Sequence, residues 1–311
     1  MTCHNCEIEC KKSGKNRNGS QRYRCSQCGK KFSAEKPLGT MYLPIEKATR
    51  VLELLLEGCS VRSTERLTGV HRDTILRLLV TAGEKCERLM ENKITNVVVK
   101  DVQCDEIFGY CYKKEQHKWM EEAQRKDIGD AYTFVGIERH TKLVLAWHLG
   151  RRDRLSAHHF AGKLRKATAE KRFQISTDGF RPYEDALEYA FGATIDYAQL
   201  VKVYGTPHEG QQRYSPGDVI GAVPYPVSGN PDKARICTSH VERQNLTMRM
   251  QIRRLTRLTN AFSKKWANLK AALALYFAFY NFCRVHKSIR MTPAMEAGIE
   301  NRIWTIGELL A

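Results

Sequence analysis

Proline and glycine are scarce in this chain of 311 residues, which holds 9 Pro and 21 Gly, while 42% of its residues are hydrophobic. Disordered chains have too few apolar residues to form a core, and fibrous chains are dominated by glycine and proline repeats. This composition excludes both classes and predicts a globular protein. The length allows one large domain with one or two small modules.

Long hydrophobic runs are missing as well. The longest, Ala271–Cys283, has 13 residues between Lys270 and Arg284, whereas a membrane-spanning helix needs about 20. The N-terminal residues are polar and rich in cysteine, unlike the apolar core of a secretion signal. We therefore expect no membrane partner, and a cytoplasmic location in which thiols stay reduced.

Acidic residues are few relative to basic ones: 34 Asp and Glu stand against 51 Lys and Arg, a formal charge of +17. An excess of this size attracts polyanions, among which nucleic acids are the usual partners of soluble basic domains. The charge therefore predicts a protein that binds nucleic acid, with an anionic membrane surface as the lesser alternative. We expect the partner to be double-stranded DNA and the protein to be associated with the nucleoid.

Cysteine is concentrated at the N-terminus, where five of the 11 cysteines fall within 28 residues. They include two C-x-x-C motifs, Cys3–Cys6 and Cys25–Cys28, each of which can place two sulfurs on one tight turn. Four thiolates so arranged predict a structural zinc ribbon over residues 1–40, with His4 and Cys10 as less favoured ligands. A disulfide pair and cysteines without metal are the alternatives.

The next segment, residues 41–92, has the pattern of a three-helix DNA-binding domain. A helical apolar period through Val51 stops at Gly58, Ser60 is placed to cap a short helix, and Gly69 to form a turn. A third helix is expected from His71 to Gly83, which completes a helix-turn-helix layout. Any small three-helix bundle would give a similar pattern. The positions expected to contact DNA are Arg62, Arg66, His71, Arg72, Thr74 and Arg77.

Alternating hydrophobicity then predicts strands, and with them a mixed α/β sheet. Two stretches, Lys113–Gly129 and Thr206–Thr238, fit neither period and are expected to be insertions or mobile loops, followed by a long helix from near Ser239. The expected strands are 97–110, a hairpin within 131–149, 172–179 and 198–205, with helices over 156–170 and 182–191.

Three acidic residues stand at the ends of these elements: Asp105 and Asp178 at strand ends and Glu242 in the first turn of the long helix. Clustered carboxylates repel one another unless a cation joins them, and oxygen ligands favour Mg²⁺ or Mn²⁺. The trio predicts a site for two such ions, which can drive phosphodiester chemistry. The alternative is ordinary surface acids. Strand alternation places Glu106 on the opposite face from Asp105, although it remains a candidate fourth acid.

The residues around Glu242 strengthen this prediction. From Ser239 to Arg290 there are 11 Lys and Arg and a single acid, Glu242 itself. A solvated helix face usually mixes both signs, so a lone carboxylate in this segment indicates an active acid beside a phosphate track. The alternative is that Glu242 neutralises Arg249. The arginines of this segment nearest Glu242, all expected to contact DNA, are Arg243, Arg249, Arg253, Arg254 and Arg257.

The order of these motifs resembles bacterial insertion-sequence transposases, closest to the insertion-sequence-one family. The matching segments are the zinc ribbon, the helix-turn-helix, DEIFGY at Asp105, STDGF at Asp178, HVERQN at Glu242 and YNFCRVHKSIRMTPAM. The resemblance implies a ribonuclease-H-like catalytic domain over residues 97–300 with insertions near 113–129 and 206–238, and a DDE triad of Asp105, Asp178 and Glu242. It also implies that Arg243, Asn245, Tyr280, Asn281, Arg284 and His286 assist DNA handling.

We therefore expect a prokaryotic DNA transposase. It would bind element ends, cleave strands with two Mg²⁺ and transfer the 3′ hydroxyl to target DNA as a homo-oligomer assembled on DNA. A DNA-binding regulator with an inert transposase-derived core is the alternative. A metal-dependent nuclease without strand transfer would share the same site.

Overall fold

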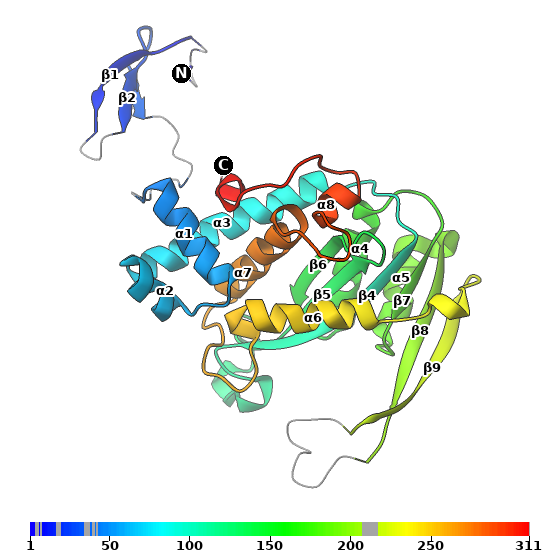
Figure 1. Ribbon diagram of the computed structural model, residues 1–311. Helices are drawn as coiled ribbons and strands as arrows, with labels where there is room; N and C mark the ends of the chain where they lie inside the picture. Colours follow the sequence, from blue (N-terminus) through cyan, green and yellow to red (C-terminus); the bar gives the residue numbers. More distant parts are fainter. Residues whose placement is uncertain are drawn as a thin grey trace.

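The computed structural model describes residues 1–3, 6, 8–16, 20–33, 38, 41, 43–206 and 217–310. It contains a small three-stranded sheet, a set of helices and a six-stranded mixed sheet (Figure 1). The expected α/β class, with a small N-terminal sheet before a larger mixed sheet, is confirmed. Within these described ranges we find no helix with the length and hydrophobicity needed to cross a membrane.

The small sheet is antiparallel, in the order β1-β2-β3. Its strands are β1 (Lys11–Lys15), β2 (Gln21–Arg24) and β3 (Lys31–Ser33). Tyr23 and Phe32 face each other across β2 and β3 with ring centroids 6.3 Å apart. Because this aromatic pair and the neighbouring cysteines make up most of its apolar core, the sheet has little hydrophobic burial to hold it together.

Three helices follow: α1 (Ile45–Leu56), α2 (Val61–Thr68) and α3 (Arg72–Lys93). The Ser60 hydroxyl accepts a hydrogen bond from the amide of Ser63, which caps α2. Gly69 ends α2 in the left-handed conformation at φ 66°, where glycine carries no steric penalty. Both local predictions are confirmed.

The predicted end of α3 at Gly83 is wrong, since the helix continues to Lys93. Gly83 is instead the point where α3 crosses α7 (Trp266–Ala278). A Cβ at Gly83 would lie 2.5 Å from the Cα of Ala271. The glycine therefore permits a close helix crossing, through which α3 joins the core of the sheet domain.

Replacing Gly83 by Ala is expected to lower the free energy of unfolding by about 1–3 kcal/mol, because the added methyl overlaps backbone atoms that cannot move alone. Urea denaturation measures the change. Gly162 is a matched control inside α4, since its Cβ would meet no described atom within 4 Å. Gly162→Ala should stabilise the protein by up to about 1 kcal/mol. Equal effects of the two substitutions would contradict the crossing.

The large sheet has the strand order β6-β5-β4-β7-β8-β9. Strands β4, β7 and β8 run parallel, and the remaining pairs are antiparallel. The strands are β4 (Asp101–Cys111), β5 (Gly129–Glu138), β6 (Val144–Gly150), β7 (Phe173–Thr177), β8 (Ile195–Tyr204) and β9 (Val219–Ser228).

The helices that follow the first hairpin lie on both faces of this sheet. They are α4 (Arg154–Ala167), α5 (Pro182–Phe191), α6 (Ser239–Gln251), α7, a π-helical turn (Phe279–Cys283) and the short α8 (Pro293–Glu296). Gly136, whose neighbours are Phe160 and Cys104, marks the face under α4. Gln103, one residue from Cys104 on β4, hydrogen-bonds α6 on the other face. Alternate β4 side chains therefore contact different helical layers.

Two segments differ most from the sequence prediction. The first strand begins at Asp101 rather than 97, because Val97 forms only a single bridge with Thr168. The segment Thr206–Thr238, expected to be an insertion or loop, contains β9, which pairs with β8 along most of its length. Residues 207–216 of that segment lie outside the described residues. Alternation failed for β9 because both of its faces carry apolar side chains.

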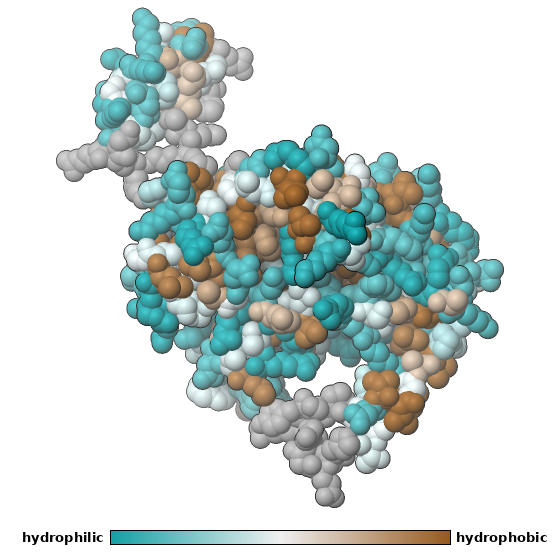
Figure 2. All heavy atoms as spheres, viewed as in Figure 1, coloured by the Kyte–Doolittle hydropathy of each residue, from teal (hydrophilic) through white to brown (hydrophobic). Residues whose placement is uncertain are grey.

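Strands β8 and β9 extend together beyond the rest of the sheet as a two-stranded arm (Figure 1). Figure 2 shows hydrophobic residues gathered on this arm. The exposed members are Val201, Val203, Tyr204, Val219, Ile220, Val223 and Tyr225. Strand β9 carries no charged residue. An uncharged apolar surface on a strongly basic protein is better suited to a protein contact than to a nucleic acid.

Candidate metal centres and their surroundings

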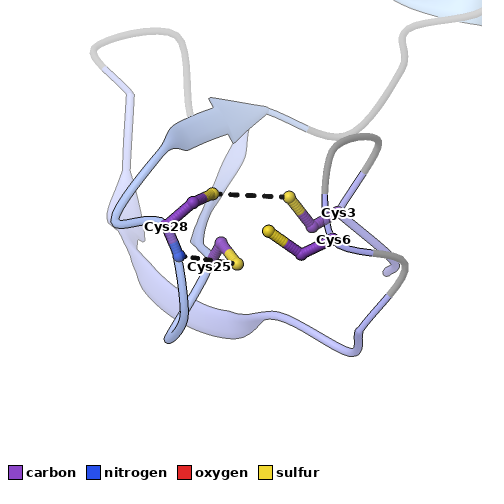
Figure 3. A group of neighbouring side chains, drawn as sticks. All are labelled: Cys3, Cys6, Cys25 and Cys28. Carbon is purple, nitrogen blue, oxygen red and sulfur yellow. Dashed lines mark hydrogen bonds between the residues drawn. The ribbon is translucent and has the colours of Figure 1, made fainter.

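The four cysteines of the two C-x-x-C motifs lie together at one end of the small sheet (Figure 3). Their sulfurs are all within 4.8 Å of one another, with 3.7 Å between Cys3 and Cys28. The Cys28 amide donates to the Cys25 sulfur at 3.5 Å, and this bond lowers the pKa of the Cys25 thiol. A group of four thiols, one of them favoured as thiolate, can bind zinc.

Of the two less favoured ligands, Cys10 is not part of this group. Cys10 is buried beside it, but its thiol donates to the carbonyl of Ile8. His4 lies outside the described residues.

Asp105 and Asp178 are neighbours because of the register between two parallel strands. Cys104 on β4 pairs with Thr177, the last residue of β7, so the next residues of each chain segment come side by side. Their carboxylate oxygens lie within 4.8 Å of each other, together with one oxygen of Glu106. The structure thus brings together two of the three predicted acids and the candidate fourth acid, Glu106. The predicted position of Asp105 at a strand end is wrong, because β4 continues to Cys111 beside β5.

The carboxyl group of Glu106 is closer than strand alternation predicted. Alternation placed it away from Asp105, yet the two carboxyl groups belong to the same cluster. The reason is that β7 ends at Thr177, so beyond this point no strand separates the two faces. Asp178 therefore lies beside both, and the two β4 side chains converge on it from opposite sides.

Burial and mutual repulsion disfavour the charged forms of these acids. Burial, and next the Asp178 charge, raise the pKa of Asp105 to about 7 and that of Glu106 to about 8. Burial is also the main reason that the pKa of Asp178 is raised. Within the described residues, Glu106 Oε1 is buried without a hydrogen-bond partner. Three oxygen donors that lack enough positive charge fit a divalent cation such as Mg²⁺.

Glu106→Gln is expected to remove part of the pH dependence of folding. The folded state raises the pKa of Glu106 from 4.5 to about 8, so it holds the proton more tightly than the unfolded chain does. The wild type therefore loses stability as the pH rises between these values, whereas Gln has no proton to lose. Relative to wild type, the variant should gain at least about 1 kcal/mol between pH 5 and pH 8.

Urea denaturation at the two pH values measures this gain. Glu170→Gln is the control, since Glu170 is an exposed acid paired with Arg165. A Glu106→Gln difference that stays constant with pH would contradict the raised pKa.

Glu242 lies near the cluster without belonging to it. It stands in the first turn of α6, and its charge contributes to the raised pKa of both Asp105 and Asp178. Its carboxylate is engaged elsewhere: the Lys202 ammonium lies 2.6 Å away, and the Thr238 hydroxyl donates to it. The alternative pairing with Arg249 is not seen, because the Arg249 guanidinium donates to the carbonyls of Leu255 and Phe108.

Gln103 fixes the position of α6, a role that the sequence did not predict. Its buried Oε1 accepts hydrogen bonds from the amides of His240 and Val241, at 2.9 and 3.3 Å. These amides belong to the first turn of α6 and lack partners within the helix. Farther along α6, Asn245 Nδ2 donates to Asp105 Oδ2 at 2.8 Å. The available signal for Gln103 was its position two residues before Asp105, on the same face of the predicted strand.

The sequence analysis also did not predict two cations beside the carboxylate cluster. Lys202 comes from β8, where it is the only charged residue between Leu200 and Tyr204. Arg152 follows β6 and lies 3.6 Å from Glu106 and 3.7 Å from Asp178, with its guanidinium over the Phe180 ring. Both come from parts of the chain distant from the acids, so only the fold brings them there.

The residues expected to contact DNA in the helical segment lie on α2 and the start of α3. His71 is the N-cap of α3, and Arg72 pairs with Glu65 at 3.4 Å. Thr74 is half-buried. The exposed members are Arg62, Arg66, His71, Arg72 and Arg77.

The second set of expected DNA contacts divides into exposed and internal residues. Arg243 and Arg257 are exposed, and Arg253 is half-buried. Burial lowers the pKa of Arg254 to about 10. Arg284 donates to Gln251 at 2.6 Å.

Three residues of the last motif make contacts within the protein. The His286 ring packs edge-on against Tyr280, and burial lowers its pKa to about 4. Asn281 hydrogen-bonds both the amide and the carbonyl of Val144 on edge strand β6. These contacts give His286, Tyr280 and Asn281 a structural role.

No protein-family model matches this sequence. Function is therefore inferred from the residues and their geometry.

Proposed function

We propose that this protein is a DNA transposase of the DDE type. The observation that carries the proposal is the pair Asp105 and Asp178 on adjacent parallel strands, Asp105 within β4 and Asp178 just past the end of β7, with Glu242 on the helix that crosses the same face. Their half-buried, like-charged carboxylates suit divalent cations rather than a structural role. The basic segment from Ser239 to Arg290 would supply attraction for the DNA backbone.

The strand order supports a ribonuclease-H-like catalytic domain. Three antiparallel strands, then a helix, a parallel strand, a helix and a second parallel strand build the order β6-β5-β4-β7-β8. This is the architecture that the resemblance to insertion-sequence transposases implies, and it places the two aspartates at its centre. Strand β9 extends it at one edge.

In the proposed reaction, Asp105, Asp178 and Glu242 would hold two Mg²⁺ or Mn²⁺, with Glu106 as a possible additional ligand. The ions would supply an activated attacking oxygen and stabilise the leaving 3′ oxygen. Asn245 orients the Asp105 carboxylate, and Gln103 fixes the helix that carries Glu242. Arg243 and Arg257, both exposed, are positioned to bind phosphates.

The N-terminal modules would select the DNA. We propose that the four cysteines hold a structural zinc ion in a ribbon over residues 1–40 and that residues 41–92 form a helix-turn-helix. Together they would recognise the element ends. Two ends need two active sites, so the active form would be a homo-oligomer assembled on DNA in the prokaryotic cytoplasm. The apolar β8–β9 arm offers a surface for such a contact.

The test is to incubate the purified protein and Mg²⁺ with end-labelled DNA that carries its own gene and flanks. We expect nicks at fixed positions outside the gene together with joined products, and neither in an EDTA control. Cleavage without joined products would identify a nuclease. Specific binding without cleavage would contradict the proposal and favour a regulator with an inert core.

A further inference from the structure

Lys202 forms the tightest contact between a cation and the acidic residues of the proposed active site. Its ammonium lies 2.6 Å from Glu242, and its charge also lowers the pKa of Asp105 and of Asp178. Arg152, a second cation at this site, is more than 3.5 Å from its two acids. One lysine is thus in electrostatic contact with all three acids of the proposed triad.

The strand register explains how Lys202 reaches this place. Thr177 at the end of β7 pairs with Gln199 on β8, so Lys202 lies three residues past the end of β7. There β8 continues beside β9 only. Glu242 is held opposite by its helix, whose first turn is bound to Gln103. The lysine and the glutamate thus come from two independently fixed elements and meet beside the carboxylate cluster.

An ammonium and a divalent cation compete for the same carboxylate oxygens. For Glu242 to become a metal ligand, the Lys202 ammonium must leave it. Lysine suits such an exchange because its stem is flexible and its charge is a compact donor of three hydrogen bonds. The side chain is 28% exposed, so it has an open side toward which it can turn.

We infer that Lys202 is a resident counter-ion of Glu242 that metal binding displaces, and that it then binds a phosphate of the DNA strand. This role rests on the proposed function. It makes Lys202 a positioning residue that links two events: metal binds weakly to the free protein and more tightly when a phosphate is present to receive the lysine. A purely structural tie between β8 and α6 would not produce this link.

The test is an Mn²⁺ titration of the full-length protein, with free Mn²⁺ measured by electron paramagnetic resonance. Lys202→Met should bind Mn²⁺ about tenfold more tightly than wild type without DNA, because the competing cation is gone. Adding a short DNA duplex should tighten binding to wild type and have less effect on the variant. Thermal unfolding shows that each variant is folded, and Lys202→Gln is a second variant should Met not fold.

Lys163→Met is the matched control. Lys163 on α4 also pairs with acids, Glu87 and Glu91 on α3, and is 34% exposed. Its replacement removes the same charge away from the carboxylates and should leave Mn²⁺ affinity near that of wild type. In a Glu242→Gln background, Lys202→Met should bring a smaller gain, because only the interaction of Lys202 with Asp105 and Asp178 is left to remove.

The outcomes separate this inference from the proposed function. If wild type binds no Mn²⁺, or if Asp178→Asn binds as much Mn²⁺ as wild type, then the carboxylates do not form a metal site and the proposed function is overturned. If wild type binds Mn²⁺ there and Lys202→Met binds it equally or more weakly, only the role of Lys202 is overturned. A tenfold gain shared by Lys163→Met would also overturn it, since the effect would then be one of net charge.

Discussion

Asp178→Asn is expected to reduce Mg²⁺-dependent cleavage of element-end DNA by about a hundredfold to a thousandfold, the scale on which a lost electrostatic contact slows a reaction. The Asp178 carboxylate lies within 4.8 Å of those of both Asp105 and Glu106. Removing its charge leaves the cluster one ligand short for two cations. The substitution therefore acts on metal binding and on the chemical step together.

The fold should survive this change. Asn has the same shape as Asp, and its amide oxygen can still accept the hydrogen bond that Asp178 Oδ1 accepts from the Phe180 amide at 3.1 Å. Removing a half-buried charge whose pKa is already raised should also relieve repulsion. Binding to element ends is expected to stay within about twofold of wild type, because it is assigned to the N-terminal modules and to contacts between basic residues and phosphates, in which Asp178 takes no part.

A cleavage assay and a gel-shift assay on the same DNA measure the two effects. Asp185→Asn is the matched control, because Asp185 is an aspartate on α5 that pairs with Arg154 at 2.8 Å and lies outside the carboxylate cluster. This control should cleave at the wild-type rate. Mg²⁺-dependent cleavage that persists in Asp178→Asn would refute the triad.

Cys25→Ser is expected to abolish zinc binding and, with it, specific recognition of element ends. Cys25 is almost fully buried, and the pKa of its thiol is lowered by the amide of Cys28, so it is the sulfur best prepared to bind as thiolate. The small sheet has three short strands and a minimal apolar core. Zinc binding to comparable modules supplies about 10–16 kcal/mol of folding free energy.

The rest of the protein should remain folded, because its core is a separate hydrophobic cluster. Metal analysis should find about one zinc per chain in wild type and almost none in the variant, since a structural site needs four ligands. Thermal unfolding of the main domain should be unchanged.

Cys10→Ser is the control for this experiment. Cys10 is buried beside the four sulfurs but directs its thiol to a carbonyl instead, so its replacement should leave zinc bound. Zinc retained by Cys25→Ser, or lost from Cys10→Ser, would contradict the ligand assignment.

Several features of the fold were predictable because local sequence controls them. The two C-x-x-C motifs each supply two of the four clustered sulfurs, and Ser60 and Gly69 act within a few residues of themselves. The order of strands and helices follows from periodicity, which is also a local property. The meeting of Asp105 and Asp178 could be anticipated from strand alternation, but not that Asp105 lies within a strand that runs on to Cys111 while β7 ends at Thr177.

Other features depend on residues that are far apart in the chain. In the sequence Gly83 is typical of a helix end. Its role becomes clear only from the contact with α7, because a side chain at this position would overlap Ala271. Strand β9 needs β8 to satisfy its backbone. Neither partner can be identified from a window of neighbouring residues.

The candidate site divides in the same way. Residue type and periodicity are enough to show which carboxylates and thiols are available and on which elements they stand. Three further features depend on the three-dimensional fold: Glu106 joins the cluster, Gln103 binds the first turn of α6, and Lys202 forms an ion pair with Glu242. The reason is physical: repulsion, burial and ion pairing act through space over a few ångströms, and sequence separation carries no information about that distance.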